Sequence, residues 1–153
     1  MYIDNHFRRQ RVMMRVKILG TGRYLPKRCI HNTELEAIFG WKKGTILSRD
    51  GVFTRYRADF QRGETPSAMG AWAAEIAINR AGLSKEDIDL IIYASATAEQ
   101  AIPDTAPLVQ DKLGLGDSGI ACFSIHSTCL SFLTAMDVAT SFIDSKRYQN
   151  ILI

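Results

Sequence analysis

One short stretch of the chain combines a reactive residue type with a local pattern that activates it. An apolar run over residues 120–125 is followed by His126-Ser-Thr and then by Cys129, at the point where an amphipathic helix is predicted to begin. The first amides of a helix have no intrahelical acceptors and carry partial positive charge, which stabilises an anion such as a thiolate. Because the thiolate is the nucleophilic form of cysteine, Cys129 is the candidate nucleophile. The alternative is an inert structural cysteine buried in the core.

The other cysteines and the nearby histidine have weaker arguments for chemistry. Cys122 lies inside a predicted strand and Cys29 in an early loop, so both are predicted to be structural. His126 lies three residues before Cys129 and could act as its base, but a base must come within hydrogen-bond distance, which the end of a strand does not ensure. The cysteines form no CxxC pair and no metal-finger spacing, so the sequence predicts neither a disulfide framework nor a metal site.

Two further features could be ligand sites. Gly20-Thr-Gly22 resembles the start of a dinucleotide-binding fingerprint, but Leu25 occupies the position of its third glycine and no helix follows, so a tight turn is predicted. Trp72 lies on the apolar face of a predicted helix and is assigned to the core. Trp41 is followed by two lysines and stays open to a ligand-binding interpretation.

The elements that must position these residues alternate along the chain. Predicted strands cover residues 15–20, 88–96, 120–125 and 149–153, and predicted helices cover residues 33–39, 65–81, 104–113 and 129–144. Strands that alternate with helices are typical of a mostly parallel sheet covered by helices, so the fold class is α/β. Thr33 and Glu36 have the spacing of a capping box, and the polar segment 42–56 is predicted to be surface structure around a turn at Asp50-Gly51.

Composition and charge limit the function classes. The chain has 153 residues, of which 46% are hydrophobic and 23% charged, as in a globular unit with one sizeable core. No apolar run approaches the ~18 residues of a membrane helix, and residues 1–14 lack the apolar core of a signal peptide. The formal charge is +3, most of it from residues 1–13, so no nucleic-acid footprint is predicted. We expect a cytoplasmic protein with neither a nucleic-acid nor a membrane partner.

The two ends of the chain carry expectations of their own. Residues 1–13 are predicted to be a flexible basic extension, or an artefact of start-site choice, ahead of a folded unit over residues 14–153. The chain finishes on the aliphatic residues Ile151-Leu-Ile153 in what is predicted to be an interior strand, whereas chain ends are usually polar. The expectation is a sheet that is truncated in its last strand.

Four motifs resemble those of one family in their order and spacing. They are Gly20-Thr-Gly-Arg-Tyr-Leu-Pro26, Ser48-Arg-Asp-Gly-Val52, Ser95-Ala-Thr97 with Ile102-Pro103, and Phe123-Ser-Ile-His-Ser-Thr-Cys129-Leu-Ser-Phe132. The family is β-ketoacyl-acyl-carrier-protein synthase III, a condensing enzyme of the thiolase superfamily. The resemblance covers residues 14–153 and matches the N-terminal half of that family's two-part fold.

The resemblance implies a fold and a reaction. The fold is the N-terminal half of a thiolase-like α/β unit, with a mixed, mostly parallel sheet, in a protein that forms homodimers. Cys129 matches the family's cysteine, which takes an acyl group from acyl-coenzyme A as a thioester. A malonyl group on acyl carrier protein then loses carbon dioxide, and the resulting carbanion attacks the acyl-enzyme. The coenzyme A thioester is a substrate, and no separate cofactor is implied.

Several departures from the family bear on this expectation. The family's catalytic His and Asn and one oxyanion donor come from its C-terminal half, so this chain alone is predicted to be inactive in condensation. His126 matches neither of those groups. Arg49 matches an arginine that meets the nucleotide, and Ile102 matches a residue that lines the partner's acyl pocket across the dimer. The family's adenine-stacking tryptophan is replaced by Thr45, and Trp41 lies one helical turn earlier.

These departures leave alternatives open. One is a secondary-metabolism acyltransferase or a head-to-head condensing enzyme of the same fold. Another is an inactive, truncated remnant that acts only in dimerisation or binding. The sequence sets neither the acyl chain length nor the choice between a coenzyme A and a carrier-bound donor.

Overall fold

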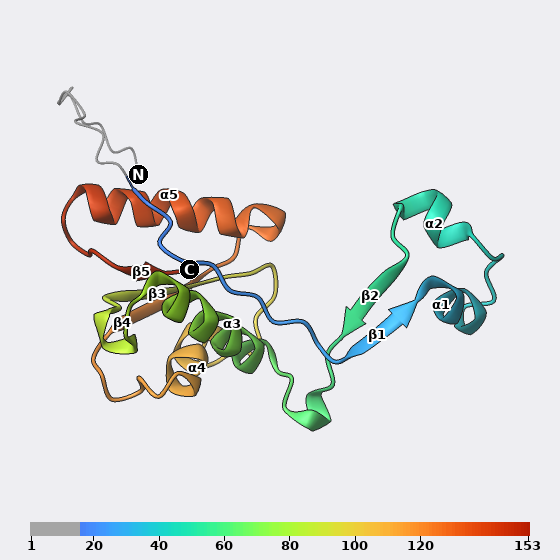
Figure 1. Cartoon of the computed structure of the whole chain (residues 1–153), viewed down its shortest axis with the longest axis horizontal. Helices are drawn as coiled ribbons and strands as arrows, with labels where there is room; N and C mark the ends of the chain where they lie inside the picture. The colour runs from blue at the N-terminus through green and yellow to red at the C-terminus, as the bar shows by residue number, and fades with distance from the viewer. Residues whose placement is uncertain (1–15) are drawn as a thin grey trace, which may run out of the picture.

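The computed structural model of this chain describes residues 16–153. The predicted basic extension over residues 1–13 lies outside the described residues. Within the described part, an arm of two strands and two short helices extends from a layered body (Figure 1). Among residues 16–153, no helix has both the length and the apolar character needed to cross a lipid bilayer.

Three parallel strands form the centre of the layered body. They are β3 (Leu90–Ala94), β4 (Ala121–Ile125) and β5 (Ile151–Leu152). β3 lies between the other two, since Leu90 pairs with Ala121 on one side and with Ile151 on the other. Both pairings are parallel, which confirms the predicted parallel sheet for these strands.

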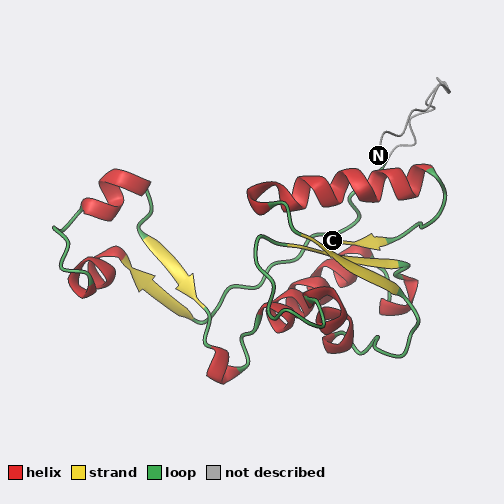
Figure 2. Cartoon of the chain, turned by 180° about the vertical axis from the view of Figure 1, so that it is seen from behind, coloured by secondary structure: helices red, strands yellow, loops and turns green. Residues whose placement is uncertain are grey.

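Helices cover both faces of this sheet. The covering helices are α3 (Pro66–Ala81), α4 (Thr105–Lys112) and α5 (Ser131–Asp144). α3 and α4 pack on one face and α5 on the other (Figure 2). Side chains of β3 alternate between the two cores: Ile91 packs with α3 and α4, whereas Leu90 and Ile92 pack with α5. A strand that is buried on both faces needs a nearly continuous apolar run, which is the pattern that predicted it.

The helix boundaries follow the local signals closely. Thr65 caps α3 with its hydroxyl, Pro66 takes the first helical position, and Gly82 ends the helix with a left-handed φ of 71°. Asp104 caps α4. α5 begins at Ser131, two residues later than predicted, because a separate helical turn precedes it. The three long helices are therefore confirmed, with a small correction at the start of α5.

The first described residues contradict the strand predicted over residues 15–20. Residues 16–27 form no strand in the described chain and run beside α3 (Figure 1). A Cβ atom at Gly20 or Gly22 would lie 2.2 or 1.9 Å from a backbone carbonyl oxygen of α3, so these glycines allow the close contact. The alternating pattern did indicate extended backbone, but among the described residues no strand pairs with it.

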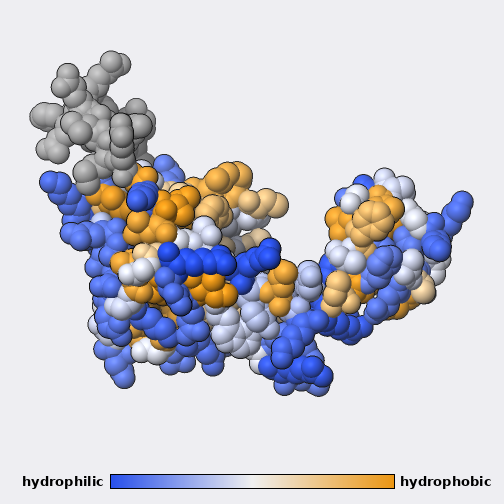
Figure 3. Space-filling view, viewed as in Figure 1, coloured by the Kyte–Doolittle hydropathy of each residue, from blue (hydrophilic) through white to orange (hydrophobic). Residues whose placement is uncertain are grey.

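The arm is built on an antiparallel pair of strands that the sequence did not predict. Its elements are β1 (Arg28–His31), α1 (Asn32–Ile38), α2 (Thr45–Asp50) and β2 (Thr54–Arg57). The predicted turn at Asp50-Gly51 is present, since Gly51 ends α2 with a φ of 68°. Apolar side chains lie at the surface of the arm (Figure 3), among them Phe39 and Phe53, each 60% exposed.

The capping box predicted for α1 is wrong. His31 caps the helix, and its ring nitrogen accepts a hydrogen bond from Thr33 N at 3.3 Å. Glu36 is buried and accepts hydrogen bonds from Ile46 N at 2.9 Å and from Gly44 N at 3.0 Å. Glu36 therefore organises the start of α2 and not the start of its own helix.

A second buried carboxylate, Glu64, holds the base of the arm. It accepts hydrogen bonds from the hydroxyl of Tyr24 at 2.7 Å, from Asp59 N at 2.8 Å and from Lys27 N at 3.2 Å. The hydrogen bond from Tyr24 contributes most to lowering the pKa of Glu64. The amide of Ile46 contributes most to lowering the pKa of Glu36.

Acidification is expected to destabilise the arm through these two carboxylates. Because their pKa values are lowered in the folded state, the stability they contribute is complete above the ordinary value of 4.5 and is lost as the pH falls through the folded-state pKa. Urea unfolding of the wild type followed by circular dichroism, between about pH 6 and about pH 3, should show this loss. Glu36→Gln and Glu64→Gln should be less stable at pH 6 and should lose less stability on acidification, whereas the exposed control Glu86→Gln should follow the wild type. Identical pH slopes in all four proteins would contradict the expectation.

Candidate active site

Cys129 lies just beyond the carboxyl end of β4, in a turn (Thr128–Leu130) that leads into α5. The residue is exposed, which argues against an inert cysteine buried in the core. The carboxyl ends of the parallel strands β3 and β4 meet at the same edge of the sheet, and α/β proteins generally bind ligands at that edge. The position of the thiol therefore suits a nucleophile.

Ser131 fixes the turn that carries the thiol. Its hydroxyl accepts a hydrogen bond from Ser127 N at 2.9 Å and donates one to Thr128 O at 2.7 Å. Leu130 N donates to Ser127 O at 3.0 Å. Thr128 has a φ of 49°, a left-handed conformation that β-branched residues rarely adopt. These contacts give the Cys129 backbone a defined position although its side chain is open to solvent.

The N-terminus of α5 lies close to this turn. No side chain caps the helix, and its first turn carries no acidic residue. No side-chain acceptor therefore competes for the terminal amides of α5, and the first of them, Ser131 N, donates to Thr128 O in the preceding turn.

A group of polar residues from three elements meets beside the turn. Nδ1 of His126 lies 2.8 Å from Ser95 O, just after β3, and Nε2 lies 3.5 Å from Oδ1 of Asp104, the N-cap of α4. Asp104 also accepts a hydrogen bond from Thr105 N at 2.8 Å. The Ser124 hydroxyl contributes most to lowering the pKa of Asp104, and the Ser95 carbonyl contributes most to raising the pKa of His126.

His126 does not form the Cys/His pair that its spacing suggested. Both of its ring nitrogens are directed to Ser95 and Asp104, and in the described part of the chain no hydrogen bond joins the ring to Cys129. The role of a base for Cys129 has no support in this geometry.

The other two cysteines occupy different environments. Cys122 is partly buried, donates its S–H to Oε1 of Gln110 at 3.0 Å, and has a pKa raised by burial. Cys29 lies on β1, far from the sheet edge that holds Cys129 (Figure 1), and is exposed. Over residues 16–153 there is no cluster of three or more His, Cys, Asp or Glu residues that could hold a metal ion.

The structure places the expected substrate-binding residues in two regions. Arg49 lies on α2 with its side chain 78% exposed, and Trp41 lies between α1 and α2 with its ring 5.3 Å from that of Phe39. Both belong to the arm, which extends away from the layered body that holds Cys129 (Figure 1). Ile102 precedes α4 and is 89% exposed. Within this chain, therefore, Cys129 and the two arm residues do not line one pocket.

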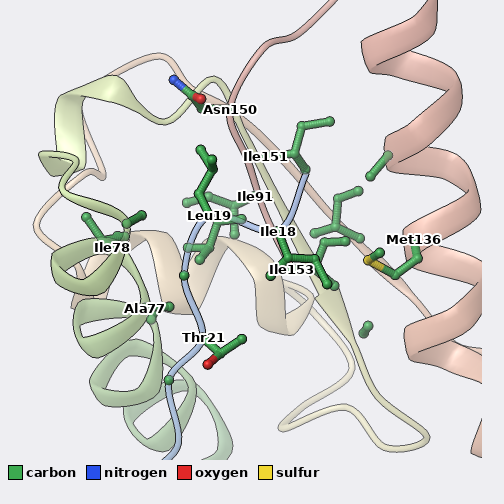
Figure 4. A pocket seen from close by; sticks show the side chains of 18 of the residues that line it. Ile18, Leu19, Thr21, Ala77, Ile78, Ile91, Met136, Asn150, Ile151 and Ile153 are labelled. Carbon is green, nitrogen blue, oxygen red and sulfur yellow. The ribbon is translucent and has the colours of Figure 1, made fainter. Parts of the chain in front are cut away.

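A large apolar pocket lies elsewhere, between the N-terminal segment and the sheet. It has a volume of about 530 Å³ and is lined by residues 16–22, α3, α5 and β5. Ile18, Leu19, Ile151 and Ile153 are among the residues around it, with Met136 of α5 at one side (Figure 4). Cys129 is not among the lining residues, so this pocket is not the site of the thiol chemistry.

Sequence reasoning missed the partners of His126. Ser124 and His126 are two residues apart at the end of a strand, which places them on one face, and Asp104 was already a candidate helix start. The missing information was that β3 and β4 are neighbours and that α4 starts beside them. Only the topology brings Ser95 and Asp104 to the same histidine.

Comparison with known proteins identifies relatives of this chain. No family model matches it. Over 140 residues it is 40% identical to β-ketoacyl-[acyl-carrier-protein] synthase III of Aquifex aeolicus, in an alignment that covers 92% of this chain and 44% of that protein. The chain therefore spans less than half the length of this relative.

Solved structures give the same result for the fold. The crystal structure of 3-oxoacyl-[acyl-carrier-protein] synthase III from Aquifex aeolicus matches with a TM-score of 0.81 and 40% identity, over 88% of this chain and 42% of that one. The priming β-ketosynthase of the R1128 polyketide pathway matches with a TM-score of 0.73 and 27% identity, over 86% of this chain and 40% of that one. The chain is thus a homologue of the N-terminal part of the β-ketoacyl-[acyl-carrier-protein] synthase III proteins, with the thiolase-like fold of that part.

Proposed function

We propose that this chain supplies the nucleophile of a condensing enzyme similar to β-ketoacyl-[acyl-carrier-protein] synthase III, in fatty-acid or related biosynthesis. One observation carries the proposal: Cys129 is exposed, lies just beyond the carboxyl end of β4 and comes two residues before the start of α5. The similarity of the chain to the N-terminal part of these synthases supports the same assignment.

The first step is acyl transfer to Cys129. Its thiolate attacks the carbonyl carbon of acyl-coenzyme A and forms a new carbon–sulfur bond. The bond to the coenzyme A sulfur breaks, and coenzyme A leaves as a thiolate that takes up a proton. The thiolate is the nucleophilic form of cysteine in this step, and it is also a good leaving group in the next step.

The second step is decarboxylative condensation. Malonyl-acyl carrier protein loses carbon dioxide, the resulting carbanion attacks the Cys129 thioester, and the thiolate leaves as the new carbon–carbon bond forms. The resemblance assigns the stabilising His and Asn to the C-terminal half of the family, so we expect this chain alone to stop at the acyl-enzyme. Acyl carrier protein as partner, a homodimer and a cytoplasmic location belong to the same proposal.

Three exposed side chains are proposed to contact the substrates. Arg49 carries a fixed positive charge that suits the phosphates of coenzyme A. Trp41 presents a half-exposed ring, and Ile102 presents an almost fully exposed aliphatic side chain that suits an acyl chain held by a second copy. Because Arg49 and Trp41 lie on the arm, apart from Cys129, these contacts require either the partner copy or the C-terminal half.

One observation favours a second candidate, an acyltransferase or head-to-head condensing enzyme of secondary metabolism. Thr45 replaces the family's adenine-stacking tryptophan, and its hydroxyl donates to Lys42 O at 2.6 Å within the turn before α2. A primer carried on a protein would not need that stacking contact. Comparing acyl-coenzyme A with acyl-acyl carrier protein as donors separates the two candidates.

Peptide mapping by mass spectrometry tests the proposal. After incubation with acetyl-coenzyme A, one acetyl group is expected on Cys129, and Cys29 and Cys122 serve as internal controls that should stay unmodified. Acylation of the control cysteines at the same rate would contradict the assignment of Cys129. The absence of any adduct, with acyl donors of every length tested, would favour a remnant that acts only in dimerisation or binding.

A further inference from the structure

The contacts of His126 favour its doubly protonated form. Ser95 O is a carbonyl oxygen and the Asp104 side chain is a carboxylate, so both partners of the ring can only accept hydrogen bonds. A neutral imidazole has one N–H and can satisfy one of the two. The observed arrangement, with 2.8 Å to Ser95 O and 3.5 Å to Asp104, is satisfied by an imidazolium ion that donates from both nitrogens.

Neighbouring hydrogen-bond donors keep the side chain of Asp104 in its ionised form. Thr105 N donates to its carboxylate at 2.8 Å. The Ser124 hydroxyl accepts a hydrogen bond from Ala106 N at 3.2 Å, which leaves its proton for Asp104. With these donors the carboxylate stays ionised and cannot supply the proton between itself and the ring. Among residues 16–153, Asp104 is also the charged group that acts on His126, and the Ser95 carbonyl just after β3 is the other hydrogen-bond partner of the ring.

The same ring is one of two anchors of the Cys129 turn. His126 begins the segment that runs through the left-handed Thr128 to the thiol, and it is tied to the ends of β3 and α4. The second anchor is the Ser131 hydroxyl, which holds the far end of the turn. Loss of one ring proton removes one of the two ties at the first anchor.

We propose that His126 is the positioning residue of the Cys129 turn and that doubly protonated His126 clamps the ends of β3, β4 and α4 together. When the ring loses a proton, the longer contact to Asp104 is released and the turn loosens. The clamp makes the reactivity of the thiol depend on pH through a group that never touches the substrate. The inference rests on Cys129 being a reactive thiol and goes beyond its use in acyl transfer.

The experiment measures His126 and Cys129 separately in the whole chain. Proton–nitrogen NMR of the imidazole rings gives the pKa of His126, which is expected above the ordinary 6.5 and lower in Asp104→Asn, a variant that keeps a good helix cap. Alkylation of Cys129 by iodoacetamide, followed by peptide mass spectrometry from about pH 5.5 to about pH 9, gives the reactivity of the thiol. In the wild type the rate per thiolate should change by about threefold to tenfold across the titration of His126, the effect of one hydrogen bond.

Two variants decide the outcome. His126→Gln should remove the step in the alkylation profile, that is, the change in rate per thiolate across the titration of His126. The matched control His31→Gln, which changes the cap of α1 on the arm, should keep this step. The proposal is overturned if His126 titrates at or below its ordinary pKa and ignores Asp104→Asn, or if His126→Gln keeps the step. If His126→Gln does not fold, Asp104→Asn gives the same reading, because it should shift the step to lower pH. Alkylation needs no acyl donor, so the clamp and the proposed acyl transfer can fail independently.

Discussion

Replacing Cys129 with alanine is expected to lower acyl transfer from acyl-coenzyme A by on the order of a thousandfold or more, because neither of the other cysteines, Cys29 and Cys122, lies at the proposed site. The expectation follows from the position of the thiol at the carboxyl end of β4, before the uncapped N-terminus of α5. The measurement is the rate at which labelled acetyl-coenzyme A transfers its acetyl group to the protein.

The chain offers matched controls for this substitution. Cys29→Ala removes an exposed cysteine from the arm, and Cys122→Ala removes a cysteine that is hydrogen-bonded to Gln110. Both are expected to retain the wild-type rate if they keep the fold, which circular dichroism can check. A Cys129→Ala protein that transfers acetyl groups as fast as Cys29→Ala would place the nucleophile elsewhere. Loss of activity in all three variants would mean that folding, and not the thiol, limits the reaction.

The sequence predicted the layered body well because each of its elements has a strong local signal. α3 has a cap, a proline and a terminal glycine, and β3 is a nearly continuous apolar run. Such signals depend on neighbouring residues alone, so they are visible without the fold. The parallel sheet then followed from the alternation of strands and helices.

The arm and the N-terminal segment could not be predicted in the same way. Glu36 has the correct spacing for a capping box, but it is used by the amides of Gly44 and Ile46, a choice made by tertiary contacts. Residues 15–20 have the alternation of a strand, yet pairing depends on whether another strand lies alongside. Local pattern predicts backbone conformation, and the partner is set by the rest of the fold.

The same difference between local signals and tertiary contacts applies to the candidate site. Cys129 was found from sequence because the transition from strand to helix around it is local. The contacts of His126 with Ser95 and Asp104 could not be found in this way, since these residues are 31 and 22 positions away along the chain. A nucleophile can therefore be predicted from its own segment, whereas the residues that position it depend on which strands become neighbours.

Substituting Gly22 with alanine is expected to destabilise the chain by about 1–3 kcal/mol, the usual cost of overpacking. A Cβ atom at this position would lie 1.9 Å from Ala73 O and 2.8 Å from Ala77 N, and both are backbone atoms of α3 that cannot move aside. Residues 16–22 must then move away from α3, which removes one wall of the apolar pocket. Urea unfolding gives the change in the free energy of unfolding.

Gly70→Ala is the matched control, because it changes the unfolded chain in the same way and differs only in its surroundings. Gly70 lies inside α3, and a Cβ atom there would lie 3.4 Å from Cγ2 of Val109, an ordinary packing distance. Alanine at this position is expected to gain about 0.5–1 kcal/mol from helix propensity. The difference between the two variants therefore isolates the contact between residues 16–22 and α3. Equal stabilities would mean that this segment does not pack on the helix in solution, and the pocket would then lose the wall that Ile18 and Leu19 provide.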